Sequence, residues 1–296
     1  MVETFRTVWL HAARPRTLPA AVVPVLVGSS QALRVGSFDW RAFGLALAGA
    51  VAIQVAANFA NDASDAARGA DPADRVGPIR MVASGRVKPR QMWTAAWVMI
   101  GVAGLCGIGL ALLAGPLLLV VGIVSVAAML GYVGGPVPYG YRGLGEVFVF
   151  VFFGLVATVG TRYAHGPVVE PVVWLLAVPV GLLAAAILVV NNLRDLDTDA
   201  ATGKRTLAVI MGRQRTRGLY AVTVLGSLAL VGVLAATSVF APWTALVLLG
   251  LPLAVRLVRT VFRAGGPHAL IPALGGTAFL HLLVGLLLAA GTWRGD

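Results

Sequence analysis

Hydrophobic residues in this 296-residue chain occur in long, uninterrupted blocks and not in alternation with polar residues. The blocks are about 16 to 24 residues long, close to the roughly 20 residues that a helix needs to cross about 30 Å of hydrocarbon. An outer-membrane barrel would require strand-length alternation instead. The pattern predicts helices at Leu18–Leu33, Ala42–Ala60, Met92–Leu113, Leu117–Val133, Leu144–Thr161, Pro171–Val190, Leu219–Phe240, Trp243–Val258 and Ala269–Trp293.

The composition agrees with a membrane location. Hydrophobic side chains make up 58% of the residues and charged side chains 12%, whereas soluble domains carry about 25% charged residues. This excludes an ordinary water-soluble domain. We therefore predict an all-α integral membrane protein with nine transmembrane helices, forming a single transmembrane domain over residues 1–296 in a plasma membrane.

The distribution of charge predicts the orientation in the membrane. A net charge of +11 raises the question of a nucleic-acid partner, so the positions of the cations have to be examined first. If the N-terminus is cytoplasmic, 19 of the 23 lysines and arginines fall in inner segments. This bias fits the positive-inside rule with the C-terminus outside. Most of the basic excess therefore reflects topology, with anionic lipid or an anionic substrate as an additional reason, and we expect no nucleic-acid partner.

Acidic residues cluster at two helix ends on the predicted inner side. The two clusters are Asp62, Asp65, Asp71 and Asp74, and Asp195, Asp197 and Asp199. Asp65 and Asp195 stand 130 residues apart, which is four helices further along in the same direction. Helices one to four and five to nine thus resemble weak repeats, and the two clusters are expected to face each other across the bundle.

Amide side chains precede the carboxylates at helical spacing. If the second helix continues beyond the membrane, Asn58, Asn61, Asp62 and Asp65 follow the i, i+3, i+4, i+7 rule and share one face. A second face runs through Asn191 or Asn192, Asp195 and Asp199. Charge at membrane depth costs roughly 2.5 to 3.5 kcal/mol per residue, and a bound cation would relieve the repulsion. Oxygen ligands of this kind favour Mg²⁺ between carboxylates and a diphosphate, whereas the alternative is solvated loop residues paired with arginines.

These residues resemble the UbiA superfamily of intramembrane aromatic prenyltransferases. The first motif of that family, N-D-x-x-D-x-x-x-D, is matched by Asn61-Asp62-Ala63-Ser64-Asp65, although Gly69 replaces the last Asp and Asp71 follows it. The second motif, D-x-x-x-D, is matched by Asp195 and Asp199. Both family motifs stand at the cytoplasmic ends of helices.

The departure at Gly69 has a resemblance of its own, to the branch that prenylates 1,4-dihydroxy-2-naphthoate in menaquinone synthesis. The similar stretches are Asn58 to Arg80, Asn191 to Val209, Gly134-Gly135-Pro136, Tyr139 to Glu146, and Ala13 to Pro19. The resemblance implies a nine-helix UbiA-like bundle with a cytoplasmic cap over the active site. It also implies Mg²⁺-dependent transfer of a polyprenyl group from polyprenyl diphosphate to the naphthoate ring, with loss of CO₂.

The same resemblance implies roles for individual residues. Asp62, Asp65, Asp195 and Asp199 would hold Mg²⁺ and act as the catalytic set. Substrate binding would involve Asn58, Asn61, Asp71, Arg75, Arg80, Tyr139, Arg142, Asn192, Arg194 and Lys204. The expected partners are the polyprenyl diphosphate, the naphthoate and membrane lipid.

Three alternatives stay open from the sequence. An ion-coupled transporter would place its carboxylates at the midplane on broken helices, whereas these carboxylates follow helix ends. A CDP-alcohol phosphotransferase carries D-x-x-D-G-x-x-A-R followed by a further acidic pair, and Asp62 to Arg68 matches only its beginning. Within the prenyltransferase family, homogentisate or hydroxybenzoate is the closest alternative acceptor.

Overall fold

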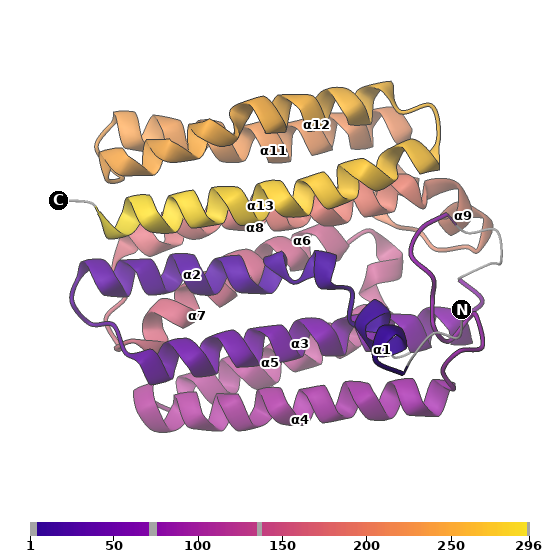
Figure 1. The fold of residues 1–296 in the computed structure, drawn as a ribbon, viewed down its shortest axis with the longest axis horizontal. Coiled ribbons are helices and arrows are strands. Elements are labelled where there is room, and N and C mark those ends of the chain that lie inside the picture. Colours follow the sequence, from indigo (N-terminus) through magenta and orange to yellow (C-terminus); the bar gives the residue numbers. More distant parts are fainter. Residues whose placement is uncertain (1–4, 71–75, 135–137, 295–296) are drawn as a thin grey trace.

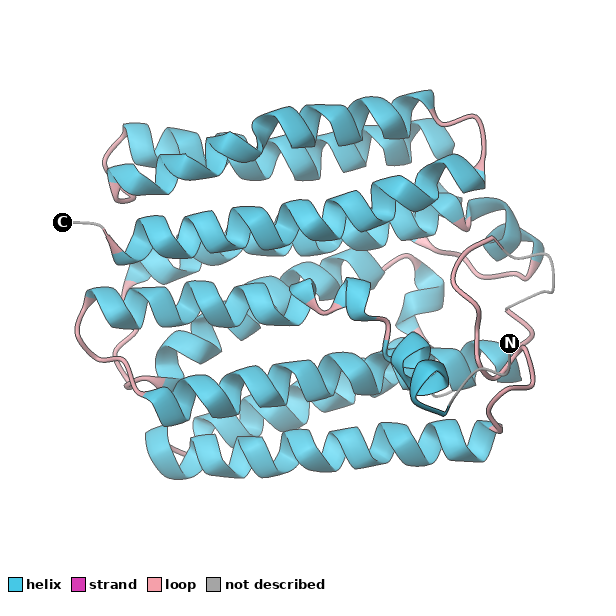
Figure 2. Cartoon of the chain, viewed as in Figure 1, coloured by secondary structure: helices cyan, strands magenta, loops and turns pink. Residues whose placement is uncertain are grey.

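The protein is described here from a computed structural model, in which residues 5–70, 76–134 and 138–294 are placed (Figure 1). Over these residues the chain is helical and contains no β-strand (Figure 2). The α-helices are α1 (Phe5–Ala13), α2 (Pro19–Arg34), α3 (Trp40–Ala67), α4 (Pro89–Ala114), α5 (Leu117–Val133), α6 (Gly145–Val149), α7 (Ala157–Ala164), α8 (Pro171–Arg194), α9 (Leu196–Ala201), α10 (Leu207–Met211), α11 (Arg213–Ala236), α12 (Leu251–Arg263) and α13 (Ile271–Trp293).

Five shorter segments link or continue these helices. The 3-10 segments are η1 (Pro15–Thr17), η2 (Tyr139–Arg142), η4 (Pro242–Gly250) and η5 (Pro267–Leu270), and η3 (Phe150–Val156) is π-helical. The η3 segment joins α6 to α7 into one helical run. Short π-helical stretches within helices are often found at functional sites, and Phe152, Phe153 and Val156 of η3 line the cavity described below.

Among the residues that the structure describes, seven helical runs are long and apolar enough to cross a membrane. They are α3, α4, α6 to α7, α8, α11, η4 to α12 and η5 to α13. The helix α5 is a shorter apolar helix of 17 residues, and α2 has 16 residues. The prediction of an all-helical membrane protein is confirmed, whereas the count of nine membrane crossings stays a prediction because it depends on these two shorter helices.

Two large apolar clusters hold the described helices together, and a third, small one contains Ala42, Leu118 and Ala164. The larger of the two large clusters joins α8, α11 and α13 through buried side chains such as Leu183, Tyr220 and Leu280. The other large cluster joins α1, α3 and α4 and includes Phe59 and Met92. These clusters fix the two motif-bearing helices, α3 and α8, in different parts of the bundle.

A close glycine contact draws α8 against η3. A Cβ atom at Gly154 would lie 2.4 Å from the Cα atom of Gly181, so neither position has room for a side chain. Small residues of this kind allow membrane helices to approach closely. The contact brings the cavity-lining part of η3 next to the helix that ends in the second motif.

The small helices gather at one end of the bundle. In Figure 1, α1 and α9 lie at the end where the N-terminus is marked, and the C-terminus lies at the opposite end. The hydrophobic blocks did not predict α1, α9 or α10, which have 9, 6 and 5 residues. These helices surround the ends of α3 and α8, where both acidic clusters are found.

Candidate active site

The first motif lies on an unbroken helix. Because α3 runs to Ala67, the predicted extension of this helix is confirmed and Asn58, Asn61, Asp62 and Asp65 share one face. Asp62 and Asp65 are almost completely buried. Buried carboxylates require partners, and the partners of these two differ in kind.

Asp62 holds the backbone of the loop that follows α3. Its two carboxylate oxygens accept hydrogen bonds from the backbone N–H groups of Met81, at 3.0 Å, and Val82, at 2.9 Å. The guanidinium of Arg14 lies 4.0 Å away. Asp62 therefore fixes the loop over the end of α3, in addition to any role toward a ligand.

Asp65 contacts three side chains that reach it from different elements. The hydroxyl of Tyr141 donates to Asp65 at 2.7 Å, and Arg80 forms an ion pair at 3.1 Å. The ammonium of Lys204 lies 3.9 Å from the same carboxylate. Asp65 thus joins α3 to the loop carrying Arg80, to η2 and to the segment after α9.

The second motif begins where α8 ends. Arg194, the last residue of α8, donates two hydrogen bonds of 2.7 Å to the carboxylate of Asp195. Both side chains are buried. Gly77, at φ 144°, passes this pair so closely that a Cβ atom would lie 3.1 Å from the guanidinium carbon of Arg194. The loop after α3 therefore packs against the second motif as well as the first.

Lys204 connects the two motifs. Its Nζ atom lies 3.9 Å from Asp65 on α3 and 3.8 Å from Asp199 on α9. It also lies 5.0 Å from the centre of the Tyr141 ring, in a cation–π arrangement. The prediction that the two acidic clusters face each other is thus reflected in one ammonium group between them.

A cavity of about 760 Å³ opens beside these residues and extends between the helices. Its polar end is lined by Asn61, Asp65, Arg80, Arg194 and Lys204. Its other walls come from α2, α3, α4, α5, η3, α7 and α8 and are mostly apolar. The cavity therefore combines a charged end with a long apolar interior.

Aromatic side chains stand between the charged and apolar parts. Tyr132 and Tyr139 line the cavity and contact each other edge to face, with ring centroids 5.5 Å apart. Tyr139 also stacks on Phe148 at 3.8 Å, and its hydroxyl donates to the carbonyl of Ala128. Burial raises the pKa of the Tyr139 hydroxyl, so this group stays neutral.

Two of the three predicted asparagines, Asn58 and Asn192, donate hydrogen bonds to groups within the protein. Asn58 donates to the carbonyl of Ala13, at 2.8 Å, and to Thr17, at 3.0 Å. Asn192 donates to the carboxylate of Glu146 at 2.9 Å. Both asparagines line the cavity, and the amide of Asn192 has a second N–H besides the one that Glu146 accepts.

The remaining predicted substrate-binding residues are Arg142, Asp71 and Arg75. Arg142 is exposed at the end of η2 and, within the described part of the chain, is not among the residues lining the cavity. Asp71 and Arg75 lie outside the described residues. The participation of these three in substrate binding stays a prediction.

Glu146 is a site residue that the sequence reasoning missed. It is buried at the start of α6, and among the described residues its second oxygen, Oε2, has no hydrogen-bond partner. The sequence feature that could have identified Glu146 is its position as an isolated carboxylate at the edge of an apolar block, where an unpaired charge is costly.

Thr17 and Gln54 were also missed. Gln54 donates to Thr17 at 3.1 Å and so supports the contact of Thr17 with Asn58.

The donor set fits a hard divalent cation such as Mg²⁺. Within the described ranges, no group of three or more histidine, cysteine or carboxylate side chains is arranged to hold a metal ion alone. Mg²⁺ is commonly bound by one or two carboxylates together with substrate phosphates and water. Asp65 and Asp199, which already share the positive charge of Lys204, meet that requirement.

The structure is a helical membrane bundle with a charged pocket at one end of an apolar cavity. Solved structures share its fold. A UbiA homolog from Aeropyrum pernix K1 gives a TM-score of 0.65 at 18% identity, covering 98% of both chains. A UbiA homolog from Archaeoglobus fulgidus bound to GPP and Mg²⁺ gives 0.63 at 14% identity, covering 96% of this chain and 99% of the other.

The chain belongs to the UbiA prenyltransferase family, whose sequence profile matches residues 21–283. It is similar to the 1,4-dihydroxy-2-naphthoate octaprenyltransferase of Mycobacterium tuberculosis, with 45% identity over 96% of this chain and 95% of the relative. The Escherichia coli protein of the same name is 37% identical over 96% of this chain and 94% of the relative. The family predicted from the two acidic motifs is confirmed.

Proposed function

We propose that this protein is a 1,4-dihydroxy-2-naphthoate polyprenyltransferase of menaquinone biosynthesis that depends on Mg²⁺. The observation that carries the proposal is the approach of both acidic motifs to Lys204 at the mouth of an apolar cavity. Relatives of that name at 37 to 45% identity support the choice of acceptor. An anionic head and an apolar tail are what the two parts of the cavity would bind.

The residues around the charged end bind and orient the diphosphate in this proposal. Arg80, Arg194 and Lys204 line the cavity and supply charge-assisted hydrogen bonds to phosphate oxygens. Asp65 and Asp199, with Asp62 and Asp195 from the same motifs, would hold Mg²⁺. When bound, the metal neutralises the charge that develops on the leaving diphosphate.

The reaction then proceeds in the aromatic part of the cavity. The bond between the prenyl carbon and the diphosphate oxygen breaks, which leaves an allylic cation facing Tyr132, Tyr139 and Phe148. The electron-rich naphthoate ring forms the new carbon–carbon bond, and its carboxyl group leaves as CO₂. The apolar walls exclude water, which would otherwise capture the cation.

A cytoplasmic active site and nine membrane crossings complete the proposal. Helices α2 and α5 are about 24 to 26 Å long at 1.5 Å per residue, close to the thickness of the hydrocarbon core. An odd number of crossings agrees with a C-terminus at the end of the bundle opposite α1 and α9 (Figure 1). The inner cations then lie on the side of the candidate active site, with the N-terminus inside and the short helices and loops forming the cap.

The test is a product analysis with purified protein. We expect incubation with Mg²⁺, a polyprenyl diphosphate and 1,4-dihydroxy-2-naphthoate to give a prenylated product that has lost CO₂, as read by mass spectrometry. The parallel reaction contains 4-hydroxybenzoate. A product formed only from hydroxybenzoate, with its carboxyl retained, would reject the naphthoate assignment and leave the family assignment intact.

A further inference from the structure

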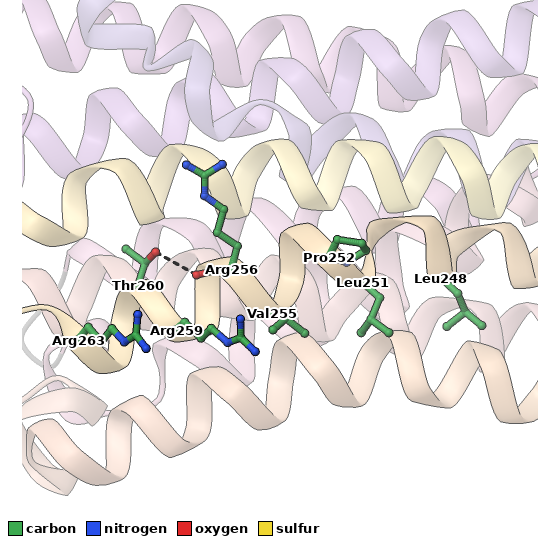
Figure 3. Close-up of a pocket in the computed structure, with 8 residues that line it drawn as sticks. All are labelled: Leu248, Leu251, Pro252, Val255, Arg256, Arg259, Thr260 and Arg263. Carbon is green, nitrogen blue, oxygen red and sulfur yellow. Dashed lines mark hydrogen bonds between the residues drawn. The ribbon is translucent and has the colours of Figure 1, made fainter.

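A second groove, separate from the cavity, runs along the outer face of α12. It has a volume of about 770 Å³ and follows the helix for its whole length (Figure 3). The half of the groove next to η4 is apolar and is formed by Leu248, Leu251 and Val255. None of the described residues that line this groove also lines the candidate active site.

The other half of the groove carries three arginines. Arg256, Arg259 and Arg263 are spaced i, i+3 and i+7 along α12, and all three line the groove. In Figure 3, Arg259 and Arg263 lie on the same side of α12 as Leu251 and Val255, and Arg256 points to the other side. All three are exposed, and among the described residues none forms an ion pair with an acidic side chain. On neighbouring α11, by contrast, Arg213 pairs with Asp197 at 2.7 Å. Three cations that line one groove therefore lack counter-charges within the described part of the protein.

The charged half and the apolar half of the groove lie where the proposed position of the membrane would require them. The connection from α12 to α13 follows Arg263 and lies at the end of the bundle that carries α1 and α9 (Figure 1). The arginines thus lie toward the charged end of the bundle, and the apolar half leads toward the opposite end. A bound lipid with its phosphate at the arginines would have an acyl chain directed into the hydrocarbon core.

We propose that this groove binds an anionic phospholipid, with its phosphate on the arginines and one acyl chain along Leu248, Leu251 and Val255. Arginine binds phosphate oxygens through two parallel hydrogen bonds, and basic pockets at the membrane surface bind anionic head groups. The orientation of a membrane protein depends on how many cations a segment contains, and not on their exact positions. Orientation alone therefore gives no reason for three arginines to line a groove that is apolar along its other half.

The test compares lipid binding by delipidated, purified protein in native mass spectrometry. The probes are phosphatidylglycerol and phosphatidylcholine with identical acyl chains. One variant carries Arg256→Gln, Arg259→Gln and Arg263→Gln, and a matched control carries Lys88→Gln, Arg90→Gln and Arg215→Gln. The control removes the same charge from exposed positions in the predicted inner segments.

We expect wild type and control to prefer phosphatidylglycerol, and the α12 variant to bind it about a hundredfold more weakly, at about fivefold per arginine. Equal binding of both lipids by wild type, or equal loss in the control, would overturn the proposal. Displacement of phosphatidylglycerol by farnesyl diphosphate in a variant that carries Asp65→Asn would also overturn it, in favour of a docking site for the substrate. Turnover in the product assay is read separately and should be unchanged in the α12 variant, so the proposed function is tested independently.

Discussion

The two acidic motifs are similar in sequence but are held in different ways. On α3, Asp62 binds the backbone of a loop and Asp65 binds side chains from three other segments. At the end of α8, Asp195 is bound by Arg194, its immediate neighbour in the chain. The first motif therefore assembles the charged end of the cavity from distant segments, whereas in the second motif Asp195 pairs with its neighbour Arg194 and Asp199 approaches the first motif through Lys204.

The asparagines that precede the two motifs also bind different partners. Asn58 is tied to the connection between α1 and α2, and Asn192 is tied to the buried carboxylate of Glu146. In both halves an amide N–H donor is used inside the protein. Since a diphosphate only accepts hydrogen bonds, its oxygens would be bound mainly by the cations, with the second N–H of Asn192 as a further donor.

The largest expected effect separates Asp65 from Asp62. Asp65→Asn removes an anionic ligand for the proposed Mg²⁺ from between Arg80 and Lys204, and a bound metal typically supplies several kcal/mol of transition-state stabilisation. We expect turnover to fall about 200- to 5,000-fold, measured with saturating Mg²⁺ and both substrates. Asp195→Asn should cause a loss of similar size. Near-wild-type turnover in either variant would contradict the metal assignment.

Asp62→Asn should also lower the stability of the protein. The amide that it introduces can accept only one of the two backbone hydrogen bonds from Met81 and Val82. Leaving a buried donor unsatisfied costs about 1 to 3 kcal/mol. We therefore expect a lower Tm in detergent for Asp62→Asn than for wild type. Equal Tm values would show that the loop does not depend on Asp62.

The next effect concerns the cation that links the motifs. Lys204→Gln should raise the Michaelis constant for polyprenyl diphosphate about ten- to a hundredfold, because a lost charge-assisted hydrogen bond costs about 1.5 to 3 kcal/mol. Arg142→Gln should have a smaller effect, since Arg142 is exposed. Arg215→Gln, at another exposed position, is the control. If all three variants behave alike, Lys204 contributes only to membrane topology.

A smaller effect is expected at Glu146. We expect Glu146→Leu to raise the Michaelis constant for the naphthoate about tenfold, because Asn192 would lose the partner that fixes its amide. Glu146→Gln keeps an oxygen acceptor and should restore most of the affinity. The constant for polyprenyl diphosphate should hardly change in either variant. Equal losses in the Leu and Gln variants would mean that the charge of Glu146, and not its hydrogen bond, is what matters.

The smallest expected effect is on the pH dependence of stability. It involves His165, at the end of the bundle opposite the candidate active site. His165 accepts a hydrogen bond from the backbone N–H of Asp39 at 3.0 Å and contacts Ser29 at 2.9 Å. Burial lowers its pKa from 6.5 to about 4. Its stabilising contribution is therefore complete above about pH 6.5 and is lost as the pH falls toward 4. We expect the Tm to fall over this range in wild type, and to fall less in His165→Leu; equal slopes would reject the role of His165.

The sequence predicted the parts of the site that depend on local order. Helical spacing placed Asn58, Asp62 and Asp65 on one face, and the extension of α3 to Ala67 followed from continuing that spacing. The pairing of the two motifs followed from their separation in the chain. These features require only knowledge of helix geometry and of where each helix ends.

Features that depend on distant contacts could not be predicted in this way. Glu146 meets Asn192 across 46 positions, and the loop that binds Asp62 does so across 19 and 20 positions. Arg142 carries a charge in a segment that resembles the family, yet its exposure follows from the packing of η2. The short helices α9 and α10 contain too few residues to produce a periodic signal.

The central claim is that α3 and the α8–α9 region form one binding site for the diphosphate. It is tested most directly by a double-mutant cycle of Asp65→Asn and Asp199→Asn, with Mg²⁺-dependent binding of a non-hydrolysable polyprenyl diphosphate analogue measured by calorimetry. Because Lys204 contacts both carboxylates, we predict that the two effects are non-additive by more than about 1 kcal/mol. Effects that add within about 0.5 kcal/mol would contradict a shared site.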